Sequence, residues 1–123
     1  MTAFSVFSHI EAFDQAWILE IRRILRPGGL FILTANVDNW QDVNDKWPVY
    51  RAAASHKTFK LEMLGKPLDR PRQVFRWNNE GSYSSVVFLR SDYVHRQWGI
   101  LMDVVALEPY FTQFQTGVVL RKA

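Results

Sequence analysis

Hydrophobic residues recur at helical spacing near the start of the chain. Within residues 8–25 the apolar positions are separated by steps of three and four: Ile10, Phe13, Trp17, Ile21 and Ile24. This spacing puts them on one face of a helix, and we expect that face to be buried. Ser8 followed by Glu11 fits a capping box at the start of the helix. Pro27, Gly28 and Gly29 should end it, with a positive φ at one of the two glycines.

A different pattern follows the glycine pair. Leu30–Ala35 is a continuous apolar run with β-branched residues, which is typical of a strand buried on both faces of a parallel sheet. Apolar and polar residues alternate at 59–63, at 73–77 and at 83–89. The last two segments are joined through Asn78-Asn79-Glu80-Gly81 and predict an antiparallel hairpin. Residues 37–57 predict only short helical turns, because Pro48 interrupts their helical spacing.

The remaining residues predict one more helix and two more strands. Ser91 should cap a short helix that runs to Trp98 and ends at Gly99. Leu101–Leu107 is predicted to be a strand that ends before Pro109, and Thr116–Leu120 is the last predicted strand. This order of elements predicts an α/β fold in a single domain over residues 1–123, with an insertion at about 37–90.

Composition excludes several classes of protein. The 123 residues are 48% hydrophobic and contain no cysteine, so a globular core is expected, whereas disulfides and thiolate metal sites are excluded. His56 and His95 are too isolated to propose a metal site. The longest apolar runs are far shorter than the roughly 20 residues that span a bilayer. No secretory signal is evident, and a cytoplasmic location is expected. The net charge of +3 is spread along the chain, so nucleic acid is an unlikely partner.

Both ends of the chain resemble one family. Residues 5–10 (Ser-Val-Phe-Ser-His-Ile) and 17–29, which end in Pro-Gly-Gly, resemble a strand exit, helix and turn of class I S-adenosylmethionine-dependent methyltransferases. Residues 91–99, 104–109 and 117–122 resemble the last helix and the closing antiparallel strand pair of the same family. The resemblance implies part of a Rossmann-like sheet, with parallel core strands, an antiparallel closing pair and an inserted antiparallel hairpin.

The sequence departs from this family at the cofactor site. Family members hold S-adenosylmethionine with a glycine-rich turn after the first strand and an acidic residue after the second. No glycine precedes Gly28, so the chain looks like the C-terminal half of a methyltransferase. We therefore expect the chain alone to be catalytically inactive and to bind the cofactor weakly at best. A non-catalytic α/β interaction or assembly module is the alternative interpretation.

The resemblance also implies site residues. Backbone groups of Phe4, Ser5 and Val6 would contact the methionine part of the cofactor, although the alternative is that Phe4 and Val6 belong to the core. His9 is the candidate base, and a surface histidine is the alternative. The candidate contacts for a small-molecule acceptor are Phe7, Asn36, Trp77, Tyr83 and Trp98. Asn36 is alternatively a turn former, and the aromatic residues are alternatively packing residues.

A partner is expected from the same comparison. Without the strands that would precede residue 1, residues 1–6 or the strand beside them would present an unpaired sheet edge. We expect that edge to pair with a second copy of the chain, which predicts a symmetric homodimer or higher self-association.

Overall fold

The described part of the chain forms an α/β structure around one mixed sheet. The computed structural model describes residues 1–47, 50, 54, 59–76 and 85–123. The strands are β1 (Thr2–Ala3), β2 (Leu30–Val37), β3 (Arg72–Arg76), β4 (Ser85–Leu89), β5 (Asp103–Thr112) and β6 (Gln115–Arg121). The helices are α1 (Asp14–Ile24) and α3 (Ser91–Tyr93), and α3 continues as a π-helical turn, η4 (Val94–Trp98). Short 3-10 turns are η1 (Phe7–His9), η2 (Trp40–Asp42) and η3 (Leu61–Met63).

Strand β2 is the centre of the sheet. The strand order is β3-β4-β2-β6-β5, and β1 also pairs with β2. Strands β1 and β4 run parallel to β2, whereas β6 is antiparallel to both β2 and β5. The predicted parallel core, antiparallel closing pair and inserted antiparallel hairpin are therefore confirmed in the described residues. Residues 77–84, which include the predicted connection of the hairpin, lie outside them.

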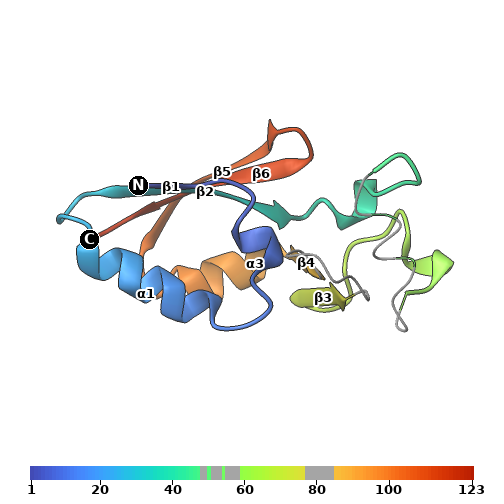
Figure 1. Cartoon of the computed structure of the whole chain (residues 1–123), viewed down its shortest axis with the longest axis horizontal. Coiled ribbons are helices and arrows are strands. Elements are labelled where there is room, and N and C mark those ends of the chain that lie inside the picture. Colours follow the sequence, from blue (N-terminus) through green and yellow to red (C-terminus); the bar gives the residue numbers. More distant parts are fainter. Residues whose placement is uncertain (48–49, 51–53, 55–58, 77–84) are drawn as a thin grey trace.

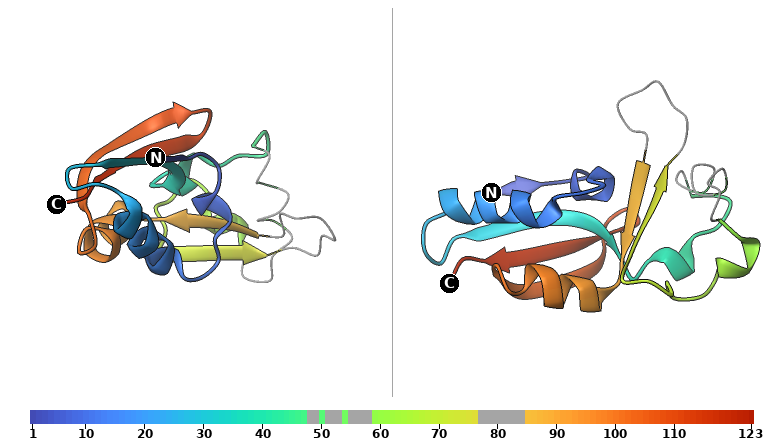
Figure 2. Two further views of the ribbon diagram at one scale, coloured as in Figure 1. Left: turned by 60° about the vertical axis from the view of Figure 1, so that its left-hand side comes forward. Right: turned by 90° about the horizontal axis from the view of Figure 1, so that it is seen from below.

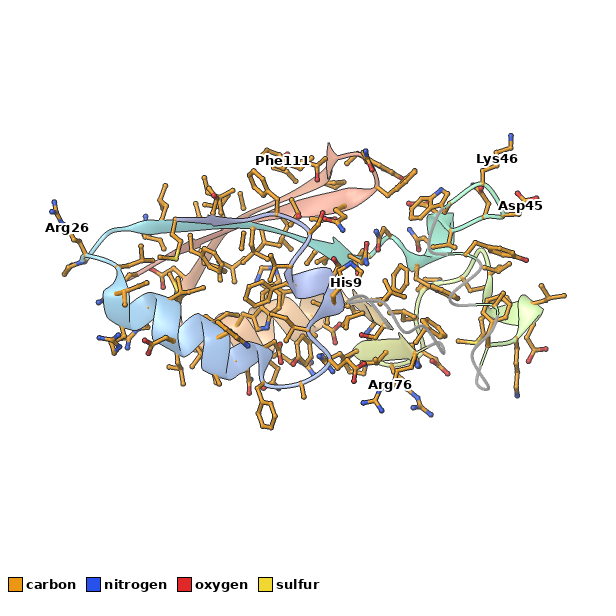
Figure 3. The ribbon with its side chains drawn as sticks, in the orientation of Figure 1. His9, Arg26, Asp45, Lys46, Arg76 and Phe111 are labelled. Carbon is orange, nitrogen blue, oxygen red and sulfur yellow. The ribbon has the colours of Figure 1, made fainter. Side chains whose placement is uncertain are left out.

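Both helices lie on one face of the sheet. Figure 1 shows α1 and α3 along the lower side of β1, β2, β5 and β6, and Figure 2 shows the same arrangement from below. Within the described residues no helix covers the opposite face. Phe111, near the end of β5, lies on that opposite side and is 50% exposed (Figure 3).

The first helix is shorter and rotated relative to the prediction. It begins at Asp14, after Phe13 in a left-handed conformation (φ 63°), and the predicted capping box of Ser8 and Glu11 is wrong. Ser8 is buried, and its hydroxyl accepts a hydrogen bond from the distant Gln115 rather than from the first turn of a helix. Residues Phe7–His9 form η1 instead.

The buried face of α1 also differs from the predicted one. Ile18 is completely buried, whereas Phe13 is 79% exposed, Trp17 56% and Ile24 49%. Of the predicted stripe within α1, Ile21 is partly buried and packs against the core, and the rest of the buried face is formed by Asp14 and Ile18. Asp14 can be buried on this face because its carboxylate accepts hydrogen bonds from Tyr93 and Trp98.

Two other boundaries were predicted wrongly. Residues 59–63 contain the 3-10 turn η3 and no strand. Strand β5 runs through Pro109 to Thr112, and its pairing with β6 shifts register between Glu108 and Thr112. Strand β5 is an edge strand, and an edge with irregular pairing accommodates a residue that has no N–H.

The turn between α1 and β2 is formed as predicted. Gly28 has a φ of +77°, a region that costs other residues conformational energy. Its N–H donates to the carbonyl of Lys122, and the N–H of Lys122 donates to Gly29. These bonds attach the turn to the end of β6.

Candidate functional site

A cavity of about 330 Å³ lies where strands β1 and β2 end. Phe4 and Ser5 directly follow β1, and Asn36 is the penultimate residue of β2. The rest of the lining comes from the β5–β6 turn and the segment after η2: Trp47, Thr112, Gln113, Phe114 and Gln115. Ligands of open α/β sheets bind at the carboxyl ends of parallel strands, so this position is the expected one for a binding site.

Ser5 is held in an unusual conformation beside the cavity. Its φ of 56° lies in the left-handed region, which is uncommon for a residue other than glycine. Its N–H donates to the hydroxyl of Thr34 at 2.7 Å, and its hydroxyl donates to Oε1 of Gln115 at 3.2 Å. Gln115 in turn donates through Nε2 to Ser8. The bonds connect the exit of β1 to β2 and β6 and fix the backbone that faces the cavity.

The buried amide of Asn36 lines the cavity and is hydrogen-bonded to a second buried amide, Asn39. Nδ2 of Asn36 donates to the carbonyl of Val87 at 3.1 Å, and Oδ1 of Asn36 accepts from Nδ2 of Asn39 at 3.0 Å. Asn39 also donates to the carbonyl of Phe114 at 3.0 Å. Oδ1 of Asn39 is buried without a hydrogen-bond partner. Buried acceptors are almost always satisfied, so this oxygen is an exception within the hydrogen-bond network that holds Asn36.

Aromatic rings form the walls. Trp47 stacks on Phe114, with ring centroids 4.4 Å apart and an interplanar angle of 28°. Phe4 is half exposed and contacts Phe111 at 6.1 Å between centroids. Among the described residues that line the cavity, none carries a charge. The lining of the cavity therefore suits a planar group, or a weakly hydrated cation, that also contacts amides and hydroxyls.

A second contact connects the turn at the site to the insertion. The hydroxyl of Tyr110 donates to the carboxylate of Asp42 at 2.6 Å, and this hydrogen bond raises the pKa of Tyr110. Because Tyr110 belongs to β5 and Asp42 to η2, the contact joins the two segments that supply the aromatic walls.

The structure brings together three of the residues predicted for the site. Phe4, Ser5 and Asn36 share the cavity. Val6 is 47% exposed and is not among the lining residues, and its carbonyl accepts from the N–H of His9. His9 donates through Nδ1 to the carbonyl of Ser85 at 2.6 Å, so its ring faces β4, between the sheet and the hairpin (Figure 3). It does not line this cavity.

The other predicted acceptor contacts have different locations. Phe7 and Trp98 are almost fully buried and contact each other with centroids 5.6 Å apart, so the structure uses their rings for core packing. A substrate cannot reach them without opening the core, which corrects their assignment as acceptor contacts. Trp77 and Tyr83 lie outside the described residues.

The sequence did not indicate five of the eight lining residues. Trp47, Phe114 and Gln115 come from segments separated by more than sixty residues, and only the pairing of β6 with β2 brings the last two to Asn36. The sequence offered one indication of these contacts. Phe114 and Gln115 directly precede the predicted strand Thr116–Leu120, and the first residue of that strand pairs with Ala35.

Comparison of the chain with protein-family models, with curated proteins and with solved structures found no match. In the described residues no helix has the length and apolar character needed to cross a membrane. Across the same residues no group of three or more His, Asp or Glu side chains is arranged to hold a metal ion.

Proposed function

We propose that the chain forms the acceptor side of an S-adenosylmethionine-dependent methyltransferase site, within a Rossmann-like sheet. The observation that carries the proposal is the cavity at the ends of β1 and β2, which joins Phe4 and Ser5 to Asn36. Phe4 and Ser5 follow the first strand and Asn36 lies near the end of the second, so the cavity joins residues from two separate parts of the sequence. A strand order of β1, β2, β6 and β5, with β6 antiparallel, supports the resemblance on which their assignment rests.

The lining residues fit one part of the cofactor. Aromatic faces attract a cationic group, and Phe4, Trp47 and Phe114 provide such faces for a sulfonium. No carboxylate occurs in the lining to bind ribose hydroxyls, and the sequence has no glycine-rich turn before Gly28. The fit therefore extends to the methionine and sulfonium end only. The cofactor supplies the electrophilic methyl group when it is bound.

The chain's own contribution would be orientation and exclusion of water. Ser5 and Asn36 are fixed by hydrogen bonds, so their polar groups present a rigid surface to an acceptor. The stacked rings of Trp47 and Phe114 would exclude water from one side of the acceptor. We expect no turnover from the chain alone, because the groups that hold the adenosine end are absent from these residues.

Nuclear magnetic resonance titration with S-adenosylmethionine tests the proposal, because it detects weak binding. We expect saturable shifts at the backbone amides of Phe4, Ser5, Asn36 and Phe114. Phe4→Ala should weaken the binding, whereas Phe13→Ala removes a more exposed ring at the start of α1 and should leave it unchanged. Absence of shifts at these four amides at millimolar cofactor would contradict the proposal.

A second candidate function is assembly, and a specific surface favours it. Phe13, Trp17 and Ile24 form an exposed apolar stripe on α1. In the described residues β1 pairs only with β2, which leaves its other edge open. We propose that a second copy of the chain pairs with this edge. Light scattering at micromolar concentration should then give twice the monomer mass, and a monodisperse monomer would contradict it.

A further inference from the structure

A second cavity, of about 390 Å³, lies between the segment that leads into β3 and the α3–η4 helix. It shares no lining residue with the cavity at the ends of β1 and β2. Its lining includes three arginines, Arg70, Arg72 and Arg96, together with Tyr93 and Gln97. Asp92 is the only acidic residue in the lining.

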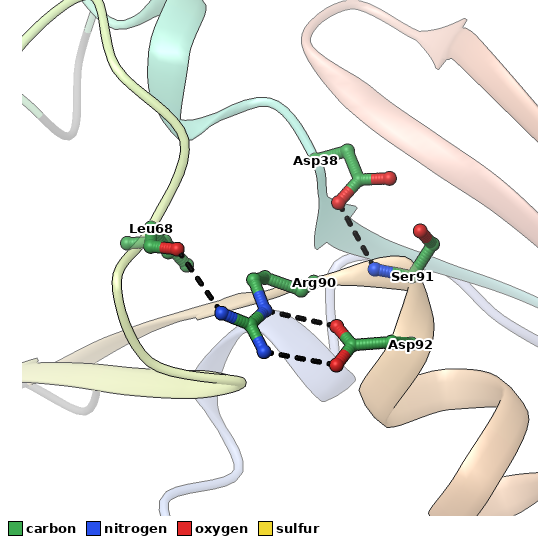
Figure 4. Close-up of polar contacts among 5 residues, drawn as sticks. All are labelled: Asp38, Leu68, Arg90, Ser91 and Asp92. Carbon is green, nitrogen blue, oxygen red and sulfur yellow. Dashed lines mark hydrogen bonds and ion pairs between the residues drawn. The ribbon is translucent and has the colours of Figure 1, made fainter.

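The charge of Asp92 is already matched outside the arginine trio. Its two carboxylate oxygens accept hydrogen bonds from Nε and Nη2 of Arg90, each at 2.9 Å (Figure 4). The hydrogen bond from Arg90, its charge and then the charge of Arg96 lower the pKa of Asp92, which keeps the carboxylate ionised. In the part of the chain that the structure describes, Arg70, Arg72 and Arg96 take part in no ion pair. The cavity therefore has an excess of positive charge.

Arg72 is anchored but incompletely satisfied. Its Nη2 donates to the carbonyl of Ile10 at 2.7 Å, which fixes the side chain against the loop before α1. Its Nε is buried and has no hydrogen-bond partner. The carboxylate of the buried Asp14 already accepts from Tyr93 and Trp98 through its Oδ2. The bond to Ile10 thus holds the Arg72 guanidinium beside the cavity without neutralising its charge, and an added anionic acceptor would do so.

The opposite wall of the cavity belongs to an irregular helix. Arg96 and Gln97 lie in the π-helical turn η4, and such turns occur frequently at functional sites. Oε1 of Gln97 accepts from Nε2 of Gln15 at 2.7 Å. This hydrogen bond fixes the side chain of Gln97 and leaves its amide N–H groups able to donate to another acceptor.

We propose that the cavity lined by Arg70, Arg72 and Arg96 is a binding site for a small phosphate-bearing anion. Guanidinium groups match the oxygens of a phosphate in paired hydrogen bonds, and three of them match its multiple charge. The cavity has the volume of a small-molecule site. Outside the cavity, Arg23 and Arg121 are paired with acids.

Titration of the full chain with inorganic pyrophosphate at low ionic strength tests the site, with calorimetry and backbone amide shifts as readouts. We expect saturable binding with shifts centred on Arg72, Arg96 and Gln97. Arg96→Gln should weaken it about tenfold, since a hydrogen bond to a charged group contributes about this factor. Arg72→Gln should weaken it further, and the exposed Arg96 variant keeps the test valid if that protein fails to fold.

Arg26→Gln is the matched control. It removes an exposed arginine just after α1 that is not among the lining residues of the cavity, and should leave pyrophosphate affinity unchanged (Figure 3). Equal loss in the Arg26 and Arg96 variants, or no saturable binding of pyrophosphate, would overturn the proposal. Tighter binding of a short oligonucleotide than of pyrophosphate, equally sensitive to Arg26, would assign the arginines to nucleic acid instead. None of these outcomes depends on the cavity proposed for methyl transfer.

Discussion

The two hydrophobic cores of this protein are built in different ways. The core under α1 is mainly aliphatic and takes its residues from regular elements, such as Ile18, Leu33 and Val118. The core of the insertion is mainly aromatic, and Trp40, Phe75 and Phe88 are in mutual ring contact. Trp40 comes from a short turn, and its indole N–H donates to the carbonyl of Met63. A regular core thus depends on periodicity, whereas an irregular one depends on a few large side chains that fit together.

Strand β4 connects the two cores. Val87 and Leu89 face the first core, and Val86 and Phe88 face the second. All five residues of the strand are buried, because each face is covered by a different cluster. The cavity at the ends of β1 and β2 is lined by Trp47 of the second core, and its Asn36 is hydrogen-bonded to Val87 of β4, which faces the first. We therefore expect the two cores to unfold together.

The largest expected effect comes from emptying each core in turn. Leu33→Ala should cost about 3 kcal/mol and Trp40→Ala about 4 kcal/mol of unfolding free energy, because both side chains are almost fully buried. Urea unfolding followed by far-ultraviolet circular dichroism and by tryptophan fluorescence should give coincident single transitions in both variants. If Trp40→Ala moves only the fluorescence transition, the cores are independent and their coupling through β4 is wrong.

Asp14 is the polar exception in the regular core. Asp14→Asn removes the charged acceptor of the Trp98 and Tyr93 hydrogen bonds, which are 2.6 and 3.0 Å long. We expect a loss of about 2 kcal/mol, since the two donors remain buried. Glu20→Gln on the exposed side of α1 is the control and should change stability by less than about 0.5 kcal/mol. Equal effects in chemical denaturation would show that Asp14 has no special role.

Each region also has one glycine at positive φ, which allows a matched test of coupling. Gly28 (φ 77°) lies at the end of α1 and Gly65 (φ 73°) in the insertion, and no atom would contact a Cβ at either position. Replacement by alanine should cost about 1 kcal/mol at both, from the backbone conformation alone. A global cost at Gly28 together with none at Gly65, measured by urea unfolding, would show that the insertion opens separately.

The smallest effect concerns pH. Burial, followed by the nearby charge of Asp14 and the hydrogen bond to it, raises the pKa of Tyr93 to about 12 from a value of 10.0. The protonated phenol thus contributes stability that is complete below pH 10 and is lost as pH rises toward 12. Tyr93→Phe should show a smaller decline in unfolding free energy between pH 8 and pH 11 than the parent chain. An unchanged decline would show that Tyr93 does not titrate in this interval.

Local sequence determined most of the regular elements. The apolar run at Leu30–Ala35, the hairpin strands and the final strand were predictable because hydrophobic periodicity and turn residues act over short distances. Gly28 was predictable for the same reason, since a tight turn after Pro27 requires a positive φ. Phe4, Ser5 and Asn36 could be placed at one site because parallel strands end at the same edge of a sheet.

Tertiary structure decided what the periodicity left open. The packing of α1 buried Ile18 and left Trp17 of the predicted stripe exposed. The same packing took Phe7 and Trp98 into the core and brought Trp47 and Phe114 to the cavity. These outcomes depend on pairings between residues far apart in sequence, whose energies no local pattern contains. The gathering of Arg70, Arg72 and Arg96 around one cavity has the same origin, because β3 and η4 become neighbours only in the folded chain.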